Sequence, residues 1–231
     1  KKLFDNRYFI LFILPFLLGS LSVLSFQPYN FTIINFIIFP TFFYIIVFIS
    51  KKSHSVYRKK PFKINLFTFG LFFGFGFYLS GVSWIVHSLT FDDNFKILIP
   101  FGLIFIPLFL SLFIAIPVLL IGPNLSLNLS SLILFSGAIA FSDYLRAHLL
   151  TGFPWNLWAY STSWMTEIMQ VLNHIGLYAY NLIVVTLFTL PVIFVFKLSL
   201  IKKILSLLIS TLFILSLYIY GNYTINKNKK F

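Results

Sequence analysis

The chain has 231 residues, of which 59% are hydrophobic and only 10% are charged. This composition is too apolar for an ordinary soluble domain, and we expect residues 1–231 to form a single integral membrane domain. The net charge of +12 is carried by short clusters at the ends of apolar runs, which is typical of membrane-orientation signals and argues against a nucleic-acid partner. The sequence contains no cysteine, which excludes disulfides, thiolate metal sites and a cysteine nucleophile from this chain.

Uncharged apolar runs mark the expected transmembrane helices, because about 20 apolar residues cross a bilayer. Residues 8–50 carry no charged side chain, and Gln27-Pro28 divides them into two such segments. The first segment is longer than the apolar core of a signal peptide and lacks a small-residue cleavage pattern, so we interpret it as a retained helix. The sequence predicts an all-α bundle of about seven transmembrane helices, at residues 8–26, 31–50, 65–89, 97–121, 125–150, 168–196 and 204–220.

The charged loops predict how the bundle is oriented. Residues 51–61 are the most basic stretch, which places this loop and the N-terminus in the cytoplasm. Asp92-Asp93 suits the opposite side, and seven spans then put the C-terminus in the periplasm. Lys227, Lys229 and Lys230 would favour the cytoplasm, but the span count takes precedence because a tail that continues into a folded external domain is translocated regardless of a few lysines.

Two faces of the helix expected at residues 65–89 carry small or polar side chains. Gly70 and Gly74 stand four apart, with Gly81 near the same face, and such a seam lets another helix approach closely. A neighbouring face carries a mildly polar stripe that could line a cavity or form an ordinary helix contact: Gly76, Ser80, Ser83 and His87. The next helix, residues 97–121, contains three prolines and is expected to be kinked.

Charge, Gly, Pro and Trp gather at the end of the helix expected at residues 125–150. Asp143 and Arg146 are three apart, so they share a helix face and can neutralise each other, which matters because an unpaired charge at membrane depth is costly. Gly152 and Pro154 then end the helix. The aromatic side chains that follow suit a membrane interface: Trp155, Trp158, Tyr160 and Trp164.

These residues allow two interpretations. Arg146 could grip a phospholipid phosphate in a forked geometry, while Phe153 and Trp155 line the path of an acyl chain. Alternatively, Asp143 and Arg146 form a structural ion pair that caps the helix and holds the loop.

Three stretches resemble the membrane region of bacterial apolipoprotein N-acyltransferases. The first is Asp143-Tyr-Leu-Arg146, then Thr151-Gly-Phe-Pro-Trp155, then Ala159-Tyr-Ser161. Residues 70–88 resemble the family's Gly-rich third helix, and residues 175–181 resemble the stretch that opens its sixth helix. The chain has Asp143 where the family usually has Glu, and Ala159 where Gly is usual, so local packing is expected to differ there.

The resemblance implies a bacterial inner-membrane protein of lipoprotein maturation. In this family a nitrilase-like extracytoplasmic domain, inserted after the seventh helix, supplies a Glu, Lys and Cys triad. The Cys takes an acyl chain from a phospholipid as a thioester and passes it to the N-terminal S-diacylglyceryl cysteine of an apolipoprotein. None of the triad can be assigned in this chain, so we interpret it as the N-terminal membrane half, either a fragment or a truncated product, that supplies anchoring and lipid access.

The resemblance also implies partners and site residues. We expect a monomer that meets a phospholipid donor and an apolipoprotein acceptor, with no cofactor, no metal and no catalytic residue in this chain. The lipid-facing, substrate-binding residues are expected to be Arg146, Gly152, Phe153, Pro154 and Trp155.

Other functions stay open at this point. His87 and Asp92 have the His-x4-Asp spacing of glycerolipid acyltransferases, in which the Asp orients a His base. A non-enzymatic membrane protein, either a transporter or a scaffold subunit, is a second alternative, although no internal repeat supports a transporter. Glu167 is interpreted as a carboxylate that favours the N-terminus of a helix. No serine-hydrolase, paired-histidine zinc or phosphate-loop motif occurs in the sequence.

Overall fold

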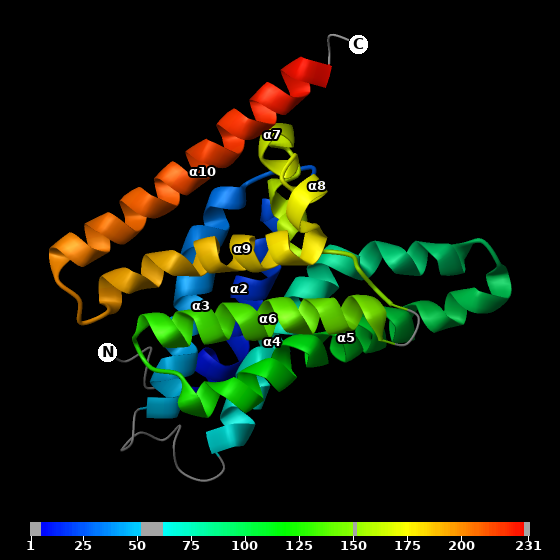
Figure 1. The fold of residues 1–231 in the computed structure, drawn as a ribbon. Coiled ribbons are helices and arrows are strands. Elements are labelled where there is room, and N and C mark those ends of the chain that lie inside the picture. Colours follow the sequence, from blue (N-terminus) through cyan, green and yellow to red (C-terminus); the bar gives the residue numbers. More distant parts are fainter. Residues whose placement is uncertain (1–5, 52–61, 150–151, 229–231) are drawn as a thin grey trace. The chain divides into compact units, whose positions relative to one another are not determined.

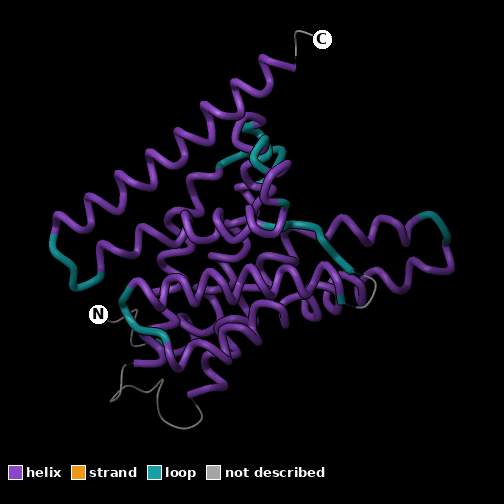
Figure 2. Tube along the Cα trace, in the orientation of Figure 1, coloured by secondary structure: helices purple, strands orange, loops and turns teal. Residues whose placement is uncertain are grey.

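The computed structural model describes residues 6–51, 62–149 and 152–228. Within these ranges the regular elements are helices and no strand occurs (Figure 2), which confirms the predicted all-α fold. The basic residues 52–61, the helix-end residues 150–151 and the terminal lysines 1, 2, 229 and 230 lie outside the described residues. Five helical segments of the described chain are long and apolar enough to cross a membrane: Thr32–Ser50, Lys63–Thr90, Asp93–Asn124, Leu177–Val195 and Leu200–Asn228.

The chain forms two compact units. The first contains Lys1–Val23 and Tyr44–Ser126, and the second contains Leu24–Phe43 and Leu127–Phe231. One of the boundaries falls inside α3 (Asn35–Lys51), which runs on as a single helix.

Close backbone approaches hold the helices of the first unit together. Its elements are η1 (Phe9–Ile13), α2 (Leu14–Ser22), the second half of α3, α4 (Phe62–Val82), η4 (Ser83–Thr90), η5 (Asp93–Leu98), α5 (Ile99–Ile121) and η6 (Gly122–Asn124). A Cβ atom at Gly74 would lie 2.7 Å from Ser111 Cβ, so the predicted glycine seam of α4 is the surface against which α5 packs. At the start of the unit, Arg7 Nη2 donates a 2.7 Å hydrogen bond to Asn65 Oδ1. The prolines Pro107 and Pro117 lie inside α5, which continues through both.

The second unit contains the remaining helices, which Figure 1 labels from α6 to α10. After η3 (Thr32–Ile34) and the first half of α3, its elements are α6 (Leu129–His148), η7 (Trp158–Thr162), α7 (Thr166–Met169), α8 (Leu172–Ile175), α9 (Leu177–Thr189), η8 (Leu190–Val195) and α10 (Leu200–Asn228). The short helix η2 (Val23–Ser25) crosses from one unit to the other.

The structure divides the range 168–196, which the sequence predicted as one helix, into four pieces. Gly176, between α8 and α9, has φ 75° and ψ 169°, a region that essentially only glycine occupies. The helix therefore stops at Gly176 and restarts as α9.

Aromatic rings fill the core of the second unit. The rings of Phe39 and Trp158 meet edge to face with centroids 4.7 Å apart, and those of Phe43 and Phe135 do so at 5.4 Å. Phe188 of α9 packs against the same face of α3, at 5.7 Å from Phe39. These contacts join α3, α6, α9 and the loop after α6 into one core.

Candidate functional site

Arg146 connects the last turn of α6 to the loop that follows it. Its side chain is only 1% exposed, and Nη2 donates a 3.0 Å hydrogen bond to Asp143 Oδ1. Nη1 donates to two loop carbonyls, at 2.6 Å to Phe153 O and at 2.7 Å to Trp155 O. The planar guanidinium suits this task, because its donors point in several fixed directions at once.

Asn181 of α9 completes this arrangement. Its Nδ2 donates a 2.9 Å hydrogen bond to Asp143 Oδ2, and its Oδ1 accepts one of 2.9 Å from the backbone N–H of Ala159. Each carboxylate oxygen of the buried Asp143 therefore has a donor, as a buried charge requires. We call Asp143, Arg146 and Asn181 the loop clamp, because together they fix the loop at three carbonyl or amide groups.

Two residues with positive φ shape the loop itself. Gly152 has φ +72°, and a Cβ atom there would lie 2.5 Å from the carbonyl oxygen of Ala147, so both conformation and space require glycine. Asn156 has φ 56°, in the left-handed region that asparagine tolerates better than most residues. The backbone N–H of Phe153 donates to Arg146 O at 2.9 Å, so Arg146 and Phe153 are joined by both backbone and side chain.

The predicted substrate-binding residues separate into a buried group and an exposed edge. Arg146 is buried and bonded within the protein, while Gly152 and Phe153 are half-buried. Pro154 is exposed, and the Trp155 side chain is 52% exposed although its carbonyl is held by Arg146. The clamp therefore fixes the backbone of a loop whose aromatic side chain stands at the surface.

The expected interfacial belt is only partly exposed. Trp158 is 1% exposed and belongs to the core, contrary to the expectation from sequence, because Phe39 and Phe26 pack around its ring. Trp164 is exposed, and its Nε1 donates a 2.8 Å hydrogen bond to Thr32 Oγ1. Tyr160 is half-buried, and its burial, followed by the neighbouring Tyr178, raises the pKa of the phenol above its ordinary value.

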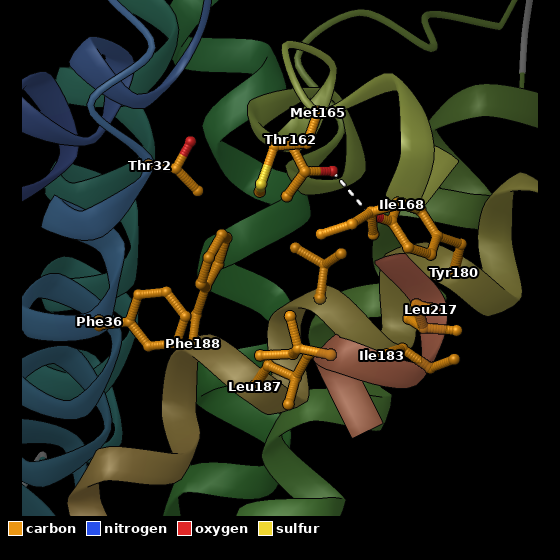
Figure 3. A pocket seen from close by; sticks show the side chains of 12 residues that line it. Thr32, Phe36, Thr162, Met165, Ile168, Tyr180, Ile183, Leu187, Phe188 and Leu217 are labelled. Atoms are coloured by element: carbon orange, nitrogen blue, oxygen red, sulfur yellow. Dashed lines mark hydrogen bonds between the residues drawn. The ribbon is translucent and has the colours of Figure 1, made fainter. Parts of the chain in front are cut away.

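A small apolar cavity lies between α9 and the neighbouring segments of α3, η7 and α10 (Figure 3). Its volume is about 60 Å³, and a hydrogen bond of 2.8 Å between Thr162 Oγ1 and the Tyr180 hydroxyl crosses one side of it. Because a water molecule accounts for about 30 Å³ of liquid, the cavity is too small for the length of an acyl chain. It is lined mainly by side chains of α9 and of its neighbours, including Phe36, Met165, Ile183, Leu187, Phe188 and Leu217.

The structure does not assemble the alternative His87–Asp92 pair. Both residues are described, and no hydrogen bond or ion pair joins their side chains; Asp92 instead accepts a 2.9 Å hydrogen bond from Asn94 N as the cap of η5. His87 lines a hollow of about 360 Å³ together with Ser83, so part of the polar stripe of α4 and η4 does face a surface depression. In the described ranges no group of His, Asp or Glu side chains is arranged to hold a metal ion.

Part of this site leaves no signal in the sequence. Asn181 ends the motif at residues 175–181, and nothing in its local sequence indicates a contact with Asp143. An aromatic cluster beside the clamp was not predicted either: Tyr144 packs against His148 with centroids 4.2 Å apart, and Tyr178 meets Tyr144 at 5.1 Å. The spacing of Tyr144 and His148 on α6 could have revealed their contact, but the partner from α9 could not have been found locally.

These features define a class: a helical membrane protein in which a buried ion pair holds an aromatic loop at the end of a helix. Residues 18–190 match the family described as the apolipoprotein N-acyltransferase N-terminal domain. This matched range includes the whole loop clamp. The chain belongs to this family, and the resemblance expected from its motifs is confirmed.

Several bacterial relatives carry the name apolipoprotein N-acyltransferase. The chain is 31% identical to the protein of Rhodopseudomonas palustris over 188 residues, which cover 79% of the chain and 33% of the relative. It is 30% identical to the Brucella melitensis protein over 178 residues, covering 76% of the chain and 33% of the relative. For Bradyrhizobium diazoefficiens the identity is 31% over 174 residues, covering 75% of the chain and 31% of the relative. The chain thus spans about a third of the length of these relatives.

Proposed function

We propose that the protein containing this chain transfers an acyl chain from a membrane phospholipid to the N-terminal S-diacylglyceryl cysteine of apolipoproteins. In this reaction the ester bond of the phospholipid is broken and an amide forms on the cysteine α-amine. The chain contributes membrane anchoring and access for lipid and substrate, and no group that makes or breaks bonds. The observation that carries this proposal is the loop clamp, which holds the Trp155 backbone while leaving the ring exposed.

In this proposal the loop residues have different roles. Trp155 and Pro154 form an apolar edge for the acyl chain of the donor, since an exposed indole suits the boundary between lipid and water. Phe153 supports this edge from the half-buried side, and Gly152 permits the turn that brings it into place. Arg146 is a positioning residue, because Nη1 is bonded to two loop carbonyls and Nη2 to Asp143.

The proposed setting is the bacterial inner membrane, with residues 1–231 as one membrane domain. Seven spans are proposed: the five long apolar helices, the shorter apolar stretch Phe9–Ser25, and α6. The N-terminus is then cytoplasmic and the C-terminus periplasmic, which puts the loop clamp on the periplasmic side. A monomer is proposed, with the phospholipid and the apolipoprotein as its partners.

The test is acyl transfer by the full-length protein in proteoliposomes, from a labelled phospholipid to a diacylglyceryl lipopeptide. We expect Trp155→Ala to lower the rate while expression and thermal unfolding stay unchanged, because the ring is exposed. Tyr223→Ala is the matched control, since Tyr223 is an exposed aromatic near the far end of α10. Equal rates for Trp155→Ala and the wild type would refute the role of the loop, and no transfer by the wild type would refute the proposed reaction.

A further inference from the structure

A second and larger hollow lies between α9 and α10 of the second unit. The two helices are joined by the short connection after η8 and separate from there, as Figure 1 shows. The groove between them has a volume of about 540 Å³, within the range of about 300–1,000 Å³ usual for ligand pockets. Its lining includes Ile133 of α6, Leu182 and Thr186 of α9, and Ser206, Ser210 and Phe213 of α10.

The surface of this groove is apolar, although it contains three hydroxyl groups. Thr186 Oγ1 donates to Leu182 O at 2.7 Å, Ser206 Oγ to Lys202 O at 2.9 Å, and Ser210 Oγ to Leu207 O at 2.8 Å. Each hydroxyl is therefore bonded to its own helix, and the groove requires no polar partner. Both helices are long and apolar enough to cross the membrane, so the occupant must itself be apolar over this length.

Three lysines stand at the end where the two helices join. Lys197 lies in the connection, and Lys202 and Lys203 lie in the first turn of α10, with Lys202 one turn before the groove residue Ser206. Lys203 Nζ donates a 2.8 Å hydrogen bond to Phe194 O, and the side chains of Lys197 and Lys202 are exposed. Cations are disfavoured at the N-terminal turn of a helix, because the helix dipole is positive there.

No acidic residue is available to these lysines nearby in the chain. The sequence contains no Asp or Glu after Glu167, and the backbone carbonyl of Glu167 lies against Gly221, near the opposite end of α10. Asp143, the other acid of the second unit, is bonded within the loop clamp. Among the described residues of the second unit, the groove thus has an apolar length and a positive end without an acidic counterpart.

We propose that this groove binds one phospholipid with an anionic headgroup. An acyl chain lies between α9 and α10, and the negative headgroup contacts Lys197, Lys202 and Lys203. Basic pockets between transmembrane helices bind anionic lipids, because the lysines attract the negative headgroup. An uncharged helix would fill the apolar groove but would leave the lysines without an anionic partner, so a lipid is the better occupant. Among the described residues of α10 only Gly221 is buried, so the protein itself covers little of this helix. In the proposal, the lipid fills the groove and holds α10 beside α9.

This inference is independent of the proposed acyl transfer. The headgroup end of the groove, marked by the three lysines, lies at the end of α9 and η8 remote from Asn181, so the inference does not rest on the role of the loop clamp. Its test therefore measures bound lipid and not activity.

The experiment uses the full-length protein in nanodiscs of phosphatidylethanolamine that contain a minor fraction of phosphatidylglycerol. Native mass spectrometry after release from the nanodiscs gives the retained lipids and their headgroup ratio. We expect severalfold enrichment of phosphatidylglycerol over the bilayer ratio in the wild type, and loss of that enrichment in the triple variant K197Q/K202Q/K203Q. Lys227→Gln is the matched control, because it removes an exposed lysine from the other end of α10.

Two further variants keep the test informative if the triple variant does not insert. The triple variant K197R/K202R/K203R keeps the charge and should keep the enrichment. Ser210→Phe fills the groove and should reduce retained lipid of either headgroup, whereas Ser216→Phe, at an exposed position of α10 outside the groove, should not. Retention at the bilayer ratio in the wild type, unchanged enrichment in the glutamine variant, or a protein dimer in place of bound lipid would overturn the proposal.

Discussion

Asn181 and Asp143 are joined by a 2.9 Å hydrogen bond that links α9 to α6 across 38 positions of the chain. The amide oxygen of Asn181 accepts a hydrogen bond from the backbone N–H of Ala159, and Asp143 accepts another from Arg146. The loop, the end of α6 and the start of α9 therefore depend on one buried network. Buried networks of this kind rigidify a structure, and their bonds can contribute more together than the sum of single deletions suggests.

Asn181→Ala is expected to destabilise the protein by about 1–3 kcal/mol for each buried group that it leaves without a partner, here Asp143 Oδ2 and the N–H of Ala159. Asn181→Asp should be worse, because it puts a second carboxylate beside Asp143. Thermal unfolding in detergent measures both changes. Asn173→Ala, at an exposed position, is the control, and equal stability of Asn181→Ala and this control would contradict the role of the network.

Arg146→Met is expected to cost about 3–5 kcal/mol, because it leaves the carboxylate of Asp143 buried without its cation. Adding Asp143→Leu in the same chain should recover part of that loss, since the uncompensated charge is then gone. The exposed pair Lys96–Asp93 gives the comparison: Lys96→Met should cost no more than about 1 kcal/mol. The measurement is a double-mutant cycle of unfolding free energies, and a double variant no more stable than Arg146→Met would show that charge burial is not the cause.

The features that the sequence could predict depend on hydropathy and on short spacings along one helix. Apolar runs predict the all-α membrane fold, and the three-residue spacing of Asp143 and Arg146 on α6 is enough to bring their side chains together. The break at Gly176 does not follow from hydropathy, because an isolated glycine is tolerated in a membrane helix; only the resemblance of residues 175–181 to a helix opening indicated that a helix begins there.

Tertiary context decides the rest of the site. Trp155 and Trp158 are the same residue type three positions apart, yet one is 52% exposed and the other is 1% exposed. Phe39, on a distant part of the chain, makes this difference by covering the ring of Trp158. Likewise, Arg146 donates hydrogen bonds to the backbone carbonyls of Phe153 and Trp155. Every residue has such a carbonyl, so the sequence cannot show which ones Arg146 contacts.

The same substitution should have opposite effects at two glycines of the second unit. Gly137→Ala, inside α6, is expected to stabilise by about 0.5–1 kcal/mol, because a Cβ atom there meets nothing within 4 Å and alanine favours the helix. Gly176→Ala is expected to destabilise by about 1–3 kcal/mol, because φ is +75°. Unfolding midpoints of the two variants check this, and a shift of the same sign in both would contradict the backbone assignment at Gly176.

Gly152→Ala should release the loop without dismantling the loop clamp. The new Cβ atom would lie 2.5 Å from Ala147 O, so the turn must shift and the hydrogen bond from Phe153 N–H to Arg146 O is lost first. Hydrogen exchange of the full-length protein, read by mass spectrometry, should become faster in the peptide that contains Phe153 and remain unchanged in α9, where Asn181 keeps its contact with Asp143. If the loop edge receives the acyl donor, transfer should fall together with loop protection. Unchanged exchange at Phe153 would mean that Gly152 does not set the loop, and faster exchange in α9 as well would mean that loop and clamp open as one unit.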